Sequence, residues 1–511
     1  MKRFVLIHLA GACIALGVAA TAQTTDVYVD AVNGSDATGN GSAAAPWKTI
    51  THANSVATQK ALIHVLPGVY DAALGESYPI TLKWPDVAGI VGVDAATCIL
   101  DGGLTASQLL RVRMVDFDRN AWLAADLTLR NAKAGLVPEP FSWVIGELRA
   151  ERVVFERIGV SSPLGNGPAL LAYAYTNSQW IVEALDCTFS RCAIGLAANG
   201  IGSSISASAN SCRFEDCDVG AQASAATGGG SAGASVRLEG CRIARCGVGV
   251  STAASADLPS GGASAGADVR QSLLVGCGRA LVGNASSSLY LEDSTVSGNQ
   301  KGIDAPWALV TSSIVRGNAV FDYASTVYAT YSNTSPLAAG TGNVDVDPQF
   351  ANPALGDFHL LAGSPMVDAG HPLAIGGSDG DLDPLTLDGD ADGVAQRDIG
   401  FDELGLVRVA TTTTPQVGGT LGFSVQAPAS WTWVLAFATA TGDVSFGNWG
   451  GLLLDPNALA VVAFGAAPGA PSFAVPNDPA LHGAEFHAQA FGWQSLPAPA
   501  SFGNRVDLVI P

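Results

Sequence analysis

The sequence predicts an all-β protein made of a right-handed parallel β-helix followed by a C-terminal β-sandwich. A short phrase recurs through the middle of the chain, and apolar and polar side chains alternate inside each copy. A separate segment rich in Pro and Gly turns ends the chain. A recurring phrase with a period of two residues indicates strands that stack turn upon turn.

Residues 1–22 have the features of a secretory signal peptide. Lys2 and Arg3 precede a long apolar run, and Ala20 and Ala22 are the small residues that a signal peptidase reads. We therefore expect a secreted or extracellular protein, possible attachment to the cell surface being left open. A lipoprotein signal ending at Cys13 is the alternative. No other apolar stretch approaches the roughly 20 residues that cross a bilayer, so no membrane span is expected.

Residues 23–103 are expected to form a cap on the solenoid. A strand at 27–30 leads into the turn 33–36, a short amphipathic helix runs from about Ile50 to Val56, and a strand with a sharp turn follows at 63–70. A helix over the open end would block an edge that could otherwise pair with another chain.

The repeat itself occupies residues 104–340. Cys187, Phe189, Cys192 and Gly195 mark the clearest copy, and the same phrase begins again at Cys212 and Cys241. Weaker copies begin at Leu127, Val153, Ser272, Ser294 and Ser313. Parallel strands stacked about 4.8 Å apart would bury one face of each copy. The small-residue stretches 221–234 and 251–266 are expected to be loops.

Stacking aligns the cysteines in two inward files. Cys187, Cys212 and Cys241 form the first, and Cys192, Cys217, Cys246 and Cys277, continued by Asn299, form the second. Buried thiols are one interpretation, because Cys is often fully buried. Disulfides between adjacent coils are the other, since the strand spacing falls within the usual Cα separation of a bridge. The pattern does not favour a metal site, because no His lies nearby in sequence.

An acidic loop in residues 341–406 predicts a Ca²⁺ site. The alternating carboxylates are Asp379, Asp381, Asp383, Asp388, Asp390 and Asp392, followed by Gly393. Alternating oxygen ligands and a turn glycine suit Ca²⁺, although Ile399 occupies the position where an EF-hand has its bidentate Glu. A solvated acidic turn is the alternative.

Residues 407–511 alternate strand-like runs with turns and are expected to form the β-sandwich. Trp431 and Trp433 share one strand face, with Trp449 and Trp493 in the same segment. Exposed tryptophans would stack on sugar rings, whereas core packing is the commoner role of Trp in a sandwich.

The charge balance excludes some partners. Asp and Glu number 45 against 25 Lys and Arg, which gives a formal net charge of −20. A field of this sign repels nucleic acid and anionic lipid, and it repels polyanionic glycans unless local basic clusters intervene.

Two segments resemble known modules. Residues 26–103 resemble the opening domain, of unknown function, of many bacterial pectin-lyase-like β-helices: a Tyr-Val-Asp strand at 28–30, an Asn-Gly-Ser-Asp turn at 33–36 and a Pro-Gly-x-Tyr turn at 67–70. Residues 341–406 are similar to the choice-of-anchor Q module, through 346–350, 356–360, 363–370 and 397–403.

The resemblance implies two functions. The favoured one is a non-catalytic β-helix protein that contacts extracellular polysaccharide or a surface protein. The alternative is a polysaccharide lyase or glycoside hydrolase acting on the flank of the helix. The outward residues Arg213, Glu215, Glu239 and Arg242, with Arg245 and Arg270 beside them, are the ligand-binding candidates. An ordinary solvated face is the other interpretation of these charges.

Overall fold

The computed structural model describes residues 25–510, apart from residues 59, 84, 114–119, 140–144, 161–166, 176–178, 228–230, 256–261, 362, 374–378, 380–382, 384, 386, 388, 390–393, 428–430, 447–450 and 495–499. The predicted signal peptide lies outside the described residues, as does Trp449. None of the helices in the described residues is long and apolar enough to cross a membrane.

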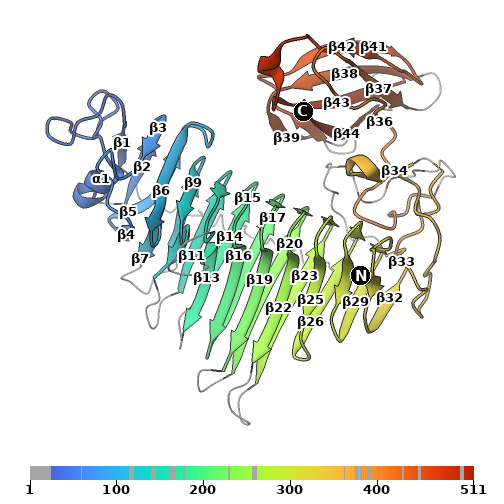
Figure 1. The fold of residues 1–511 in the computed structure, drawn as a ribbon, viewed down its shortest axis with the longest axis horizontal. Helices are drawn as coiled ribbons and strands as arrows, with labels where there is room; N and C mark the ends of the chain where they lie inside the picture. The colour runs from blue at the N-terminus through green and yellow to red at the C-terminus, as the bar shows by residue number, and fades with distance from the viewer. Residues whose placement is uncertain are drawn as a thin grey trace, which may run out of the picture.

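Three parallel sheets form a long solenoid, which confirms the predicted β-helix (Figure 1). In the described residues sheet I has 12 strands: β1 (Asp26–Val29), β2 (Ala61–Val65), β5 (Val87–Gly92), β8 (Asn120–Ala125), β11 (Ile145–Glu151), β14 (Gln179–Leu185), β17 (Ser204–Asn210), β20 (Ala232–Glu239), β23 (Ala263–Arg270), β26 (Ser287–Glu292), β29 (Trp307–Thr311) and β32 (Thr326–Thr330). Sheet II has 11 mostly short strands: β3 (Gly68–Tyr70), β6 (Cys98–Ala106), β9 (Thr128–Ala132), β12 (Val154–Glu156), β15 (Thr188–Ser190), β18 (Arg213–Glu215), β21 (Arg242–Ala244), β24 (Leu273–Val275), β27 (Thr295–Ser297), β30 (Ile314–Val315) and β33 (Asn333–Thr334). Sheet III has ten: β4 (Ile80–Lys83), β7 (Leu110–Arg113), β10 (Leu136–Pro138), β13 (Pro168–Tyr175), β16 (Ile194–Ile201), β19 (Val219–Ala226), β22 (Val248–Ser255), β25 (Arg279–Gly283), β28 (Lys301–Asp304) and β31 (Phe321–Tyr323).

Left-handed residues make the sharp bends on either side of sheet II. Before β18 the bend residue is Ser211, with φ of 53°, and after it Asp216, with φ of 54°. The residue after the first bend is Cys212, whose Sγ lies 3.3 Å from the carbonyl oxygen of Asn210 and 3.5 Å from that of Ala184 in the preceding coil. The thiol therefore ties the bend to the neighbouring coil.

The two cysteine files are present, and their sulfurs are free thiols. The described cysteines are all buried and unbridged: Cys98, Cys187, Cys192, Cys212, Cys217, Cys241, Cys246 and Cys277. Oxygen replaces sulfur further along the first file, at Ser272, Ser294, Ser313 and Ser332. In the second file Asn299 and Asn318 take the same place. This bend therefore holds a small side chain that can donate a hydrogen bond to a backbone carbonyl oxygen.

Phenylalanines and glycines shape the interior of the coils. Phe155, Phe189 and Phe214 stack with ring centroids 4.9 and 4.6 Å apart and planes within 2° of parallel. The recurring glycine of the repeat lies near the start of the sheet III strand, as Gly195 does in β16 and Gly220 in β19. A Cβ on Gly220 would lie 2.6 Å from the carbonyl oxygen of Gly249, so only glycine fits this close approach between coils.

The predicted loops at 221–234 and 251–266 are largely strands in the residues that the structure describes, so the prediction is wrong there. They contain the end of β19, the start of β20, the end of β22 and the start of β23. Ala221, Ala223 and Ala225 point into the solenoid, whereas Gln222 and Ser224 lie on the other face. Alanine fills the narrow interior here, so the alternation has little hydropathic contrast.

The N-terminal segment supplies coils of its own as well as a cap. Parallel pairing already begins at β1 and β2. The helix α1 (Ile50–Val56) forms as predicted, with the side chain of Thr49 accepting a hydrogen bond from the His52 amide. The buried Glu76 carboxylate accepts hydrogen bonds from the amides of Ile50 and Thr51, which fixes the start of α1.

Beyond the solenoid the strands are antiparallel. A hairpin of β34 (Phe350–Asn352) and β35 (Asp357–Leu360), with the short helix η1 (Pro353–Leu355) between them, comes first. The C-terminal sheets are β36 (Arg408–Thr411), β37 (Thr420–Gln426) and β42 (Ser472–Ala474); β41 (Ala460–Ala466), β38 (Thr432–Ala438), β43 (Glu485–Trp493) and β44 (Ala500–Val509); and the pair β39 (Thr441–Ser445) and β40 (Gly451–Leu454), with η3 (Pro479–Leu481). Residues of the first two sheets share one core, in which Trp431 and Trp433 are buried, so these tryptophans are core residues.

Candidate ligand-binding surface

An aromatic and aliphatic patch lies on the outer face of sheet I near its C-terminal end. Tyr290, Leu309 and Tyr328 occupy the same register position on β26, β29 and β32. All three are exposed, by 43%, 39% and 61%. Trp307 meets Tyr290 edge to face, with ring centroids 6.1 Å apart. In the following text these four residues are called the sheet I patch.

The patch is continuous with a group of charges on the same face. Arg270 lies 2.9 Å from Asp268 and 3.1 Å from Glu292. The hydrogen bond that Arg270 donates to the Asp268 carboxylate raises the pKa of Arg270 and outweighs its partial burial. Arg270 is therefore fully charged and neutralised by its neighbours.

Two adjoining shallow depressions follow the patch. One is lined by Asp268, Arg270, Tyr290, Leu291, Glu292, Leu309 and Thr311, and the other by Tyr290, Pro306, Trp307, Leu309, Thr326 and Tyr328. Tyr290 and Leu309 line both. The two depressions therefore form one surface that crosses several strands along the solenoid axis.

The four ligand-binding candidates from the sequence do not converge. Arg213, Glu215 and Arg242 lie on sheet II, on the strands β18 and β21. Glu239 ends β20 on sheet I, where it pairs with Arg237 at 2.8 Å. Their outward orientation is as predicted, and a ligand-binding role for the four remains a prediction.

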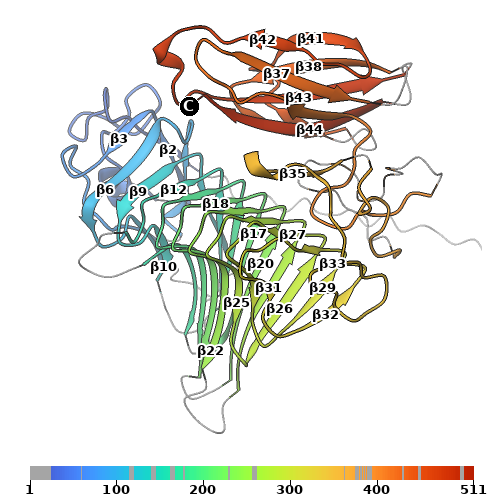
Figure 2. The same ribbon diagram turned by 45° about the vertical axis from the view of Figure 1, so that its right-hand side comes forward.

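The C-terminal domain contacts the sheet II candidates. Arg213 donates a hydrogen bond to Asp507 on β44, with Nη2 and Oδ2 2.9 Å apart. Figure 2 shows the C-terminal sheets lying along the sheet II flank, with β44 facing it. This part of the flank is therefore an interdomain contact and not an open cleft.

Asp507 is held as a carboxylate by several partners. His487 Nδ1 and Arg505 Nε both lie 2.7 Å from its Oδ1. Burial alone would raise the pKa of Asp507, but the His487 hydrogen bond and the charges of Arg505 and Arg213 hold it well below its usual range.

Only part of the predicted calcium loop can be described. Asp381, Asp388, Asp390 and Asp392 lie outside the described residues. Asp379 and Asp383 are buried, and the two oxygens of Asp379 accept hydrogen bonds from the amides of Asp383 and Glu403. Within the described ranges no three His, Cys, Asp or Glu side chains form a group that could hold a metal ion. Calcium binding thus remains a prediction.

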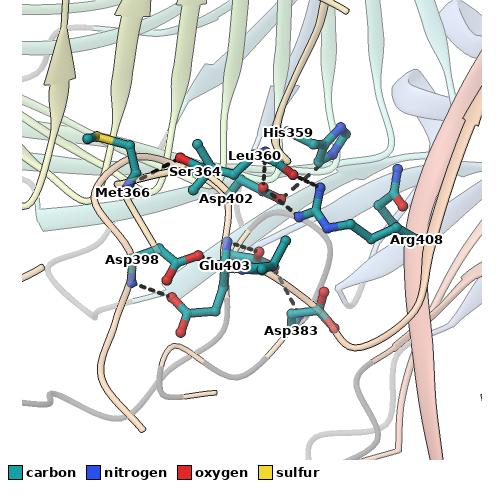
Figure 3. A network of polar contacts seen from close by, with 12 residues as sticks. His359, Leu360, Ser364, Met366, Asp383, Asp398, Asp402, Glu403 and Arg408 are labelled. Carbon is teal, nitrogen blue, oxygen red and sulfur yellow. Dashed lines mark hydrogen bonds and ion pairs between the residues drawn. The ribbon is translucent and has the colours of Figure 1, made fainter. Parts of the chain in front are cut away.

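Buried carboxylates organise the neighbouring turn (Figure 3). Asp398 accepts hydrogen bonds from the amides of Asp368 and Leu404, each at 2.7 Å, and Glu403 accepts one from Asp398 at 3.0 Å. Burial raises the pKa of both carboxyls; the charges of Asp402 and Asp368 add to the shift of Asp398, and the charge of Asp398 adds to that of Glu403. Their role in this arrangement is to hold the backbone of the segment.

The sheet I patch was missed in the sequence. Tyr290 and Tyr328 occupy outward positions of ordinary alternating strands, so each looks like an isolated exposed aromatic. Only the register of β26, β29 and β32 brings them into one file, and that register depends on loop lengths between coils.

A comparison with protein families supports the resemblance of the opening segment. A family model described as "Protein of unknown function (DUF1565)" matches residues 32–102, within the segment that resembles an opening domain of unknown function. The choice-of-anchor Q resemblance stays a prediction. A search of curated protein sequences gives no match to the chain.

A comparison with solved structures gives matches of low identity and low TM-score. A "Rhamnogalacturonan lyase" is 10% identical, with a TM-score of 0.30, over 64% of this chain and 91% of that one. "The complex structure of XylC with xylose" is 8% identical, with a TM-score of 0.33, over 64% of this chain and 87% of that one. Neither likeness carries an argument about what this chain does. The three parallel sheets and the family match together make the chain a parallel β-helix protein whose residues 32–102 match DUF1565.

Proposed function

We propose that the chain is a secreted, non-catalytic protein that binds extracellular polysaccharide on the outer face of sheet I. The observation that carries the proposal is the sheet I patch. Tyr and Trp rings present an apolar face and a polar edge, a combination that suits the faces and hydroxyls of sugar rings.

The direction of the patch favours a polymer. Tyr290 and Tyr328 are two strands apart, which is about 10 Å along the solenoid axis. A sugar chain lying along the axis would contact Tyr290, Leu309 and Tyr328 in succession. The hydroxyls of the sugars would meet Asp268, Arg270 and Glu292 beside them.

The charge of the site favours a neutral sugar chain. Arg270 is already paired with two carboxylates, so no free cation faces the patch among the residues that line the two depressions. A uronate chain would be repelled by the excess of negative charge.

Retention of the purified chain on insoluble polysaccharides tests the proposal. The panel contains neutral glucans, xylan and chitin together with pectin and alginate. Tyr290→Ala or Tyr328→Ala should weaken retention about tenfold, because loss of an aromatic contact costs about 1.4 kcal/mol at the upper end of its range. The matched control is Tyr28→Ala, at the opposite end of the same sheet face, where Tyr28 stacks on His64.

The possible outcomes separate the alternatives. Retention that falls only in the Tyr290 and Tyr328 variants supports the proposal. Retention by no polysaccharide would overturn it and favour a protein partner. Release of reducing ends or unsaturated sugars would instead support a hydrolase or a lyase.

A further inference from the structure

The sheet II flank carries an arginine pair at the junction with the C-terminal domain. Arg213 on β18 and Arg242 on β21 occupy the same register position on adjacent strands. Like charges directly opposite each other on a sheet are destabilising. The pair therefore needs negative charge close by.

Nearby carboxylates are engaged elsewhere. Asp507 receives hydrogen bonds from Arg213, Arg505 and His487. Glu215 lies 3.0 Å from Arg245, which also binds Asp216. None of the described residues forms a hydrogen bond or ion pair with the Arg242 guanidinium.

The surroundings of Arg242 combine burial with a close approach of the neighbouring backbone. Burial lowers the pKa of Arg242; Glu215 raises it and the charge of Arg213 lowers it further. Gly356, at the end of η1, lies next to the guanidinium, and a Cβ there would approach Nη2 to 3.3 Å. Glycine at this position lets the backbone pass close to Nη2 without placing a side chain against the guanidinium.

The local charge is positive in an otherwise acidic chain. The cations around the junction are Arg213, Arg242, Arg245 and Arg505, and the anions are Glu215, Asp216 and Asp507. The planar guanidinium fork binds the paired oxygens of carboxylate, sulfate or phosphate. We propose that Arg242, with Arg213 beside it, binds one such anionic group at the junction between the solenoid and the C-terminal domain. This site is separate from the sheet I patch and does not depend on it.

Thermal unfolding of the full chain tests the site. Sodium sulfate, phosphate and glucuronate are titrated separately against sodium chloride of equal ionic strength. A saturable rise in Tm of about 2 °C is expected for the wild type, because a ligand that binds only the folded state stabilises it. Glucuronate and the inorganic anions distinguish a sugar acid from a free oxyanion. Because sulfate and phosphate also stabilise proteins non-specifically, only a saturable rise that is lost in Arg242→Met supports the site.

Three variants decide the outcome. Arg242→Met should abolish the anion-dependent rise while leaving Tm without anion unchanged or higher, because it removes an unpaired, partly buried cation. Arg242→Lys should need a higher anion concentration, since it keeps the charge and loses the fork. Arg237→Met is the matched control, because Arg237 lies on sheet I, paired with Glu239, and this variant should respond like the wild type.

Two results would overturn the proposal. One is an anion response that is the same in the wild type and both Arg242 variants. The other is a lower Tm of Arg242→Met without anion and an unchanged anion response, which would make Arg242 an ordinary interdomain contact of Asp507. If Arg242→Met does not fold, the wild type and Arg242→Lys still give the comparison.

Discussion

The stacked phenylalanines allow a quantitative test of how the coils cohere. Phe189 lies between Phe155 and Phe214 and makes two ring contacts, whereas Phe155 makes one. Phe189→Leu keeps most of the buried volume and removes both contacts. Each ring contact contributes about 0.5–1.5 kcal/mol beyond burial, so the variant should lose about 1–3 kcal/mol and Phe155→Leu about half of that. Phe189→Ala, which also leaves a cavity, should lose about 3–5 kcal/mol.

Amide hydrogen exchange is the appropriate assay. The solenoid and the C-terminal sheets have separate cores, and amide exchange shows which coils are destabilised, whereas an unfolding midpoint gives only one value for each transition. In a solenoid each coil contacts its neighbours only, and the effect should be centred on β12, β15 and β18. Protection in Phe189→Leu should fall there by about tenfold to a hundredfold.

Two results would refute this reasoning. Equal losses for Phe189→Leu and Phe155→Leu would mean that the ring contacts contribute nothing. A uniform loss of protection along the whole solenoid would mean that coils unfold as one unit and not as neighbours.

Four further predictions follow from other features. Gly220→Ala should cost about 1–3 kcal/mol in a denaturant titration, because the new Cβ meets a carbonyl at 2.6 Å, whereas Gly262→Ala, with nothing within 4 Å, should be neutral. The eight buried thiols should react with a thiol reagent only once the protein is unfolded, and the assay contains no reductant. If fewer than eight thiols react, the others form disulfide bridges. The lowered pKa of Asp507 stabilises the fold above about pH 4, and this stability is lost as the pH falls through the lower pKa of the folded state, so Asp507→Asn should flatten the fall of Tm below about pH 4. Calcium should raise Tm, and a chelator should reverse the rise. The double variant Asp388→Asn, Asp390→Asn should lose this response. If calcium leaves the Tm of the wild type unchanged, the segment is a solvated acidic turn.

The sequence predicted sheet II better than the other two sheets. Phe189, Phe214 and Ile243 alternate with charged or polar residues, so both the strands and their stacking are visible. In sheets I and III the inward residues of the middle coils are largely alanines and the outward ones serines and glycines. The same alternation is present there, but its contrast in hydropathy is too small to distinguish a strand from a loop.

The functional surfaces depend on contacts that a linear pattern does not contain. The outward direction of Arg213 was correctly predicted, but its partner Asp507 lies 294 residues away in sequence. Tyr290 and Tyr328 become neighbours only through the register of sheet I. The spacing of the repeats in the sequence shows how many coils the solenoid has. It does not show where the C-terminal domain contacts them, because that contact depends on complementary surfaces.

The alanine-lined coils have a mechanical consequence. Hydrogen bonds between parallel strands run along the solenoid axis, so tension on the ends of the rod stretches them directly. From β19 to β23, beyond Phe214, sheets I and III line the interior largely with alanine, with contributions such as Ala223, Ala234 and Ala265. Side chains of this size add little dispersion energy to each interface between coils. A rod pulled along its length should therefore part first in this middle stretch, between the phenylalanine stack and the bulkier terminal coils.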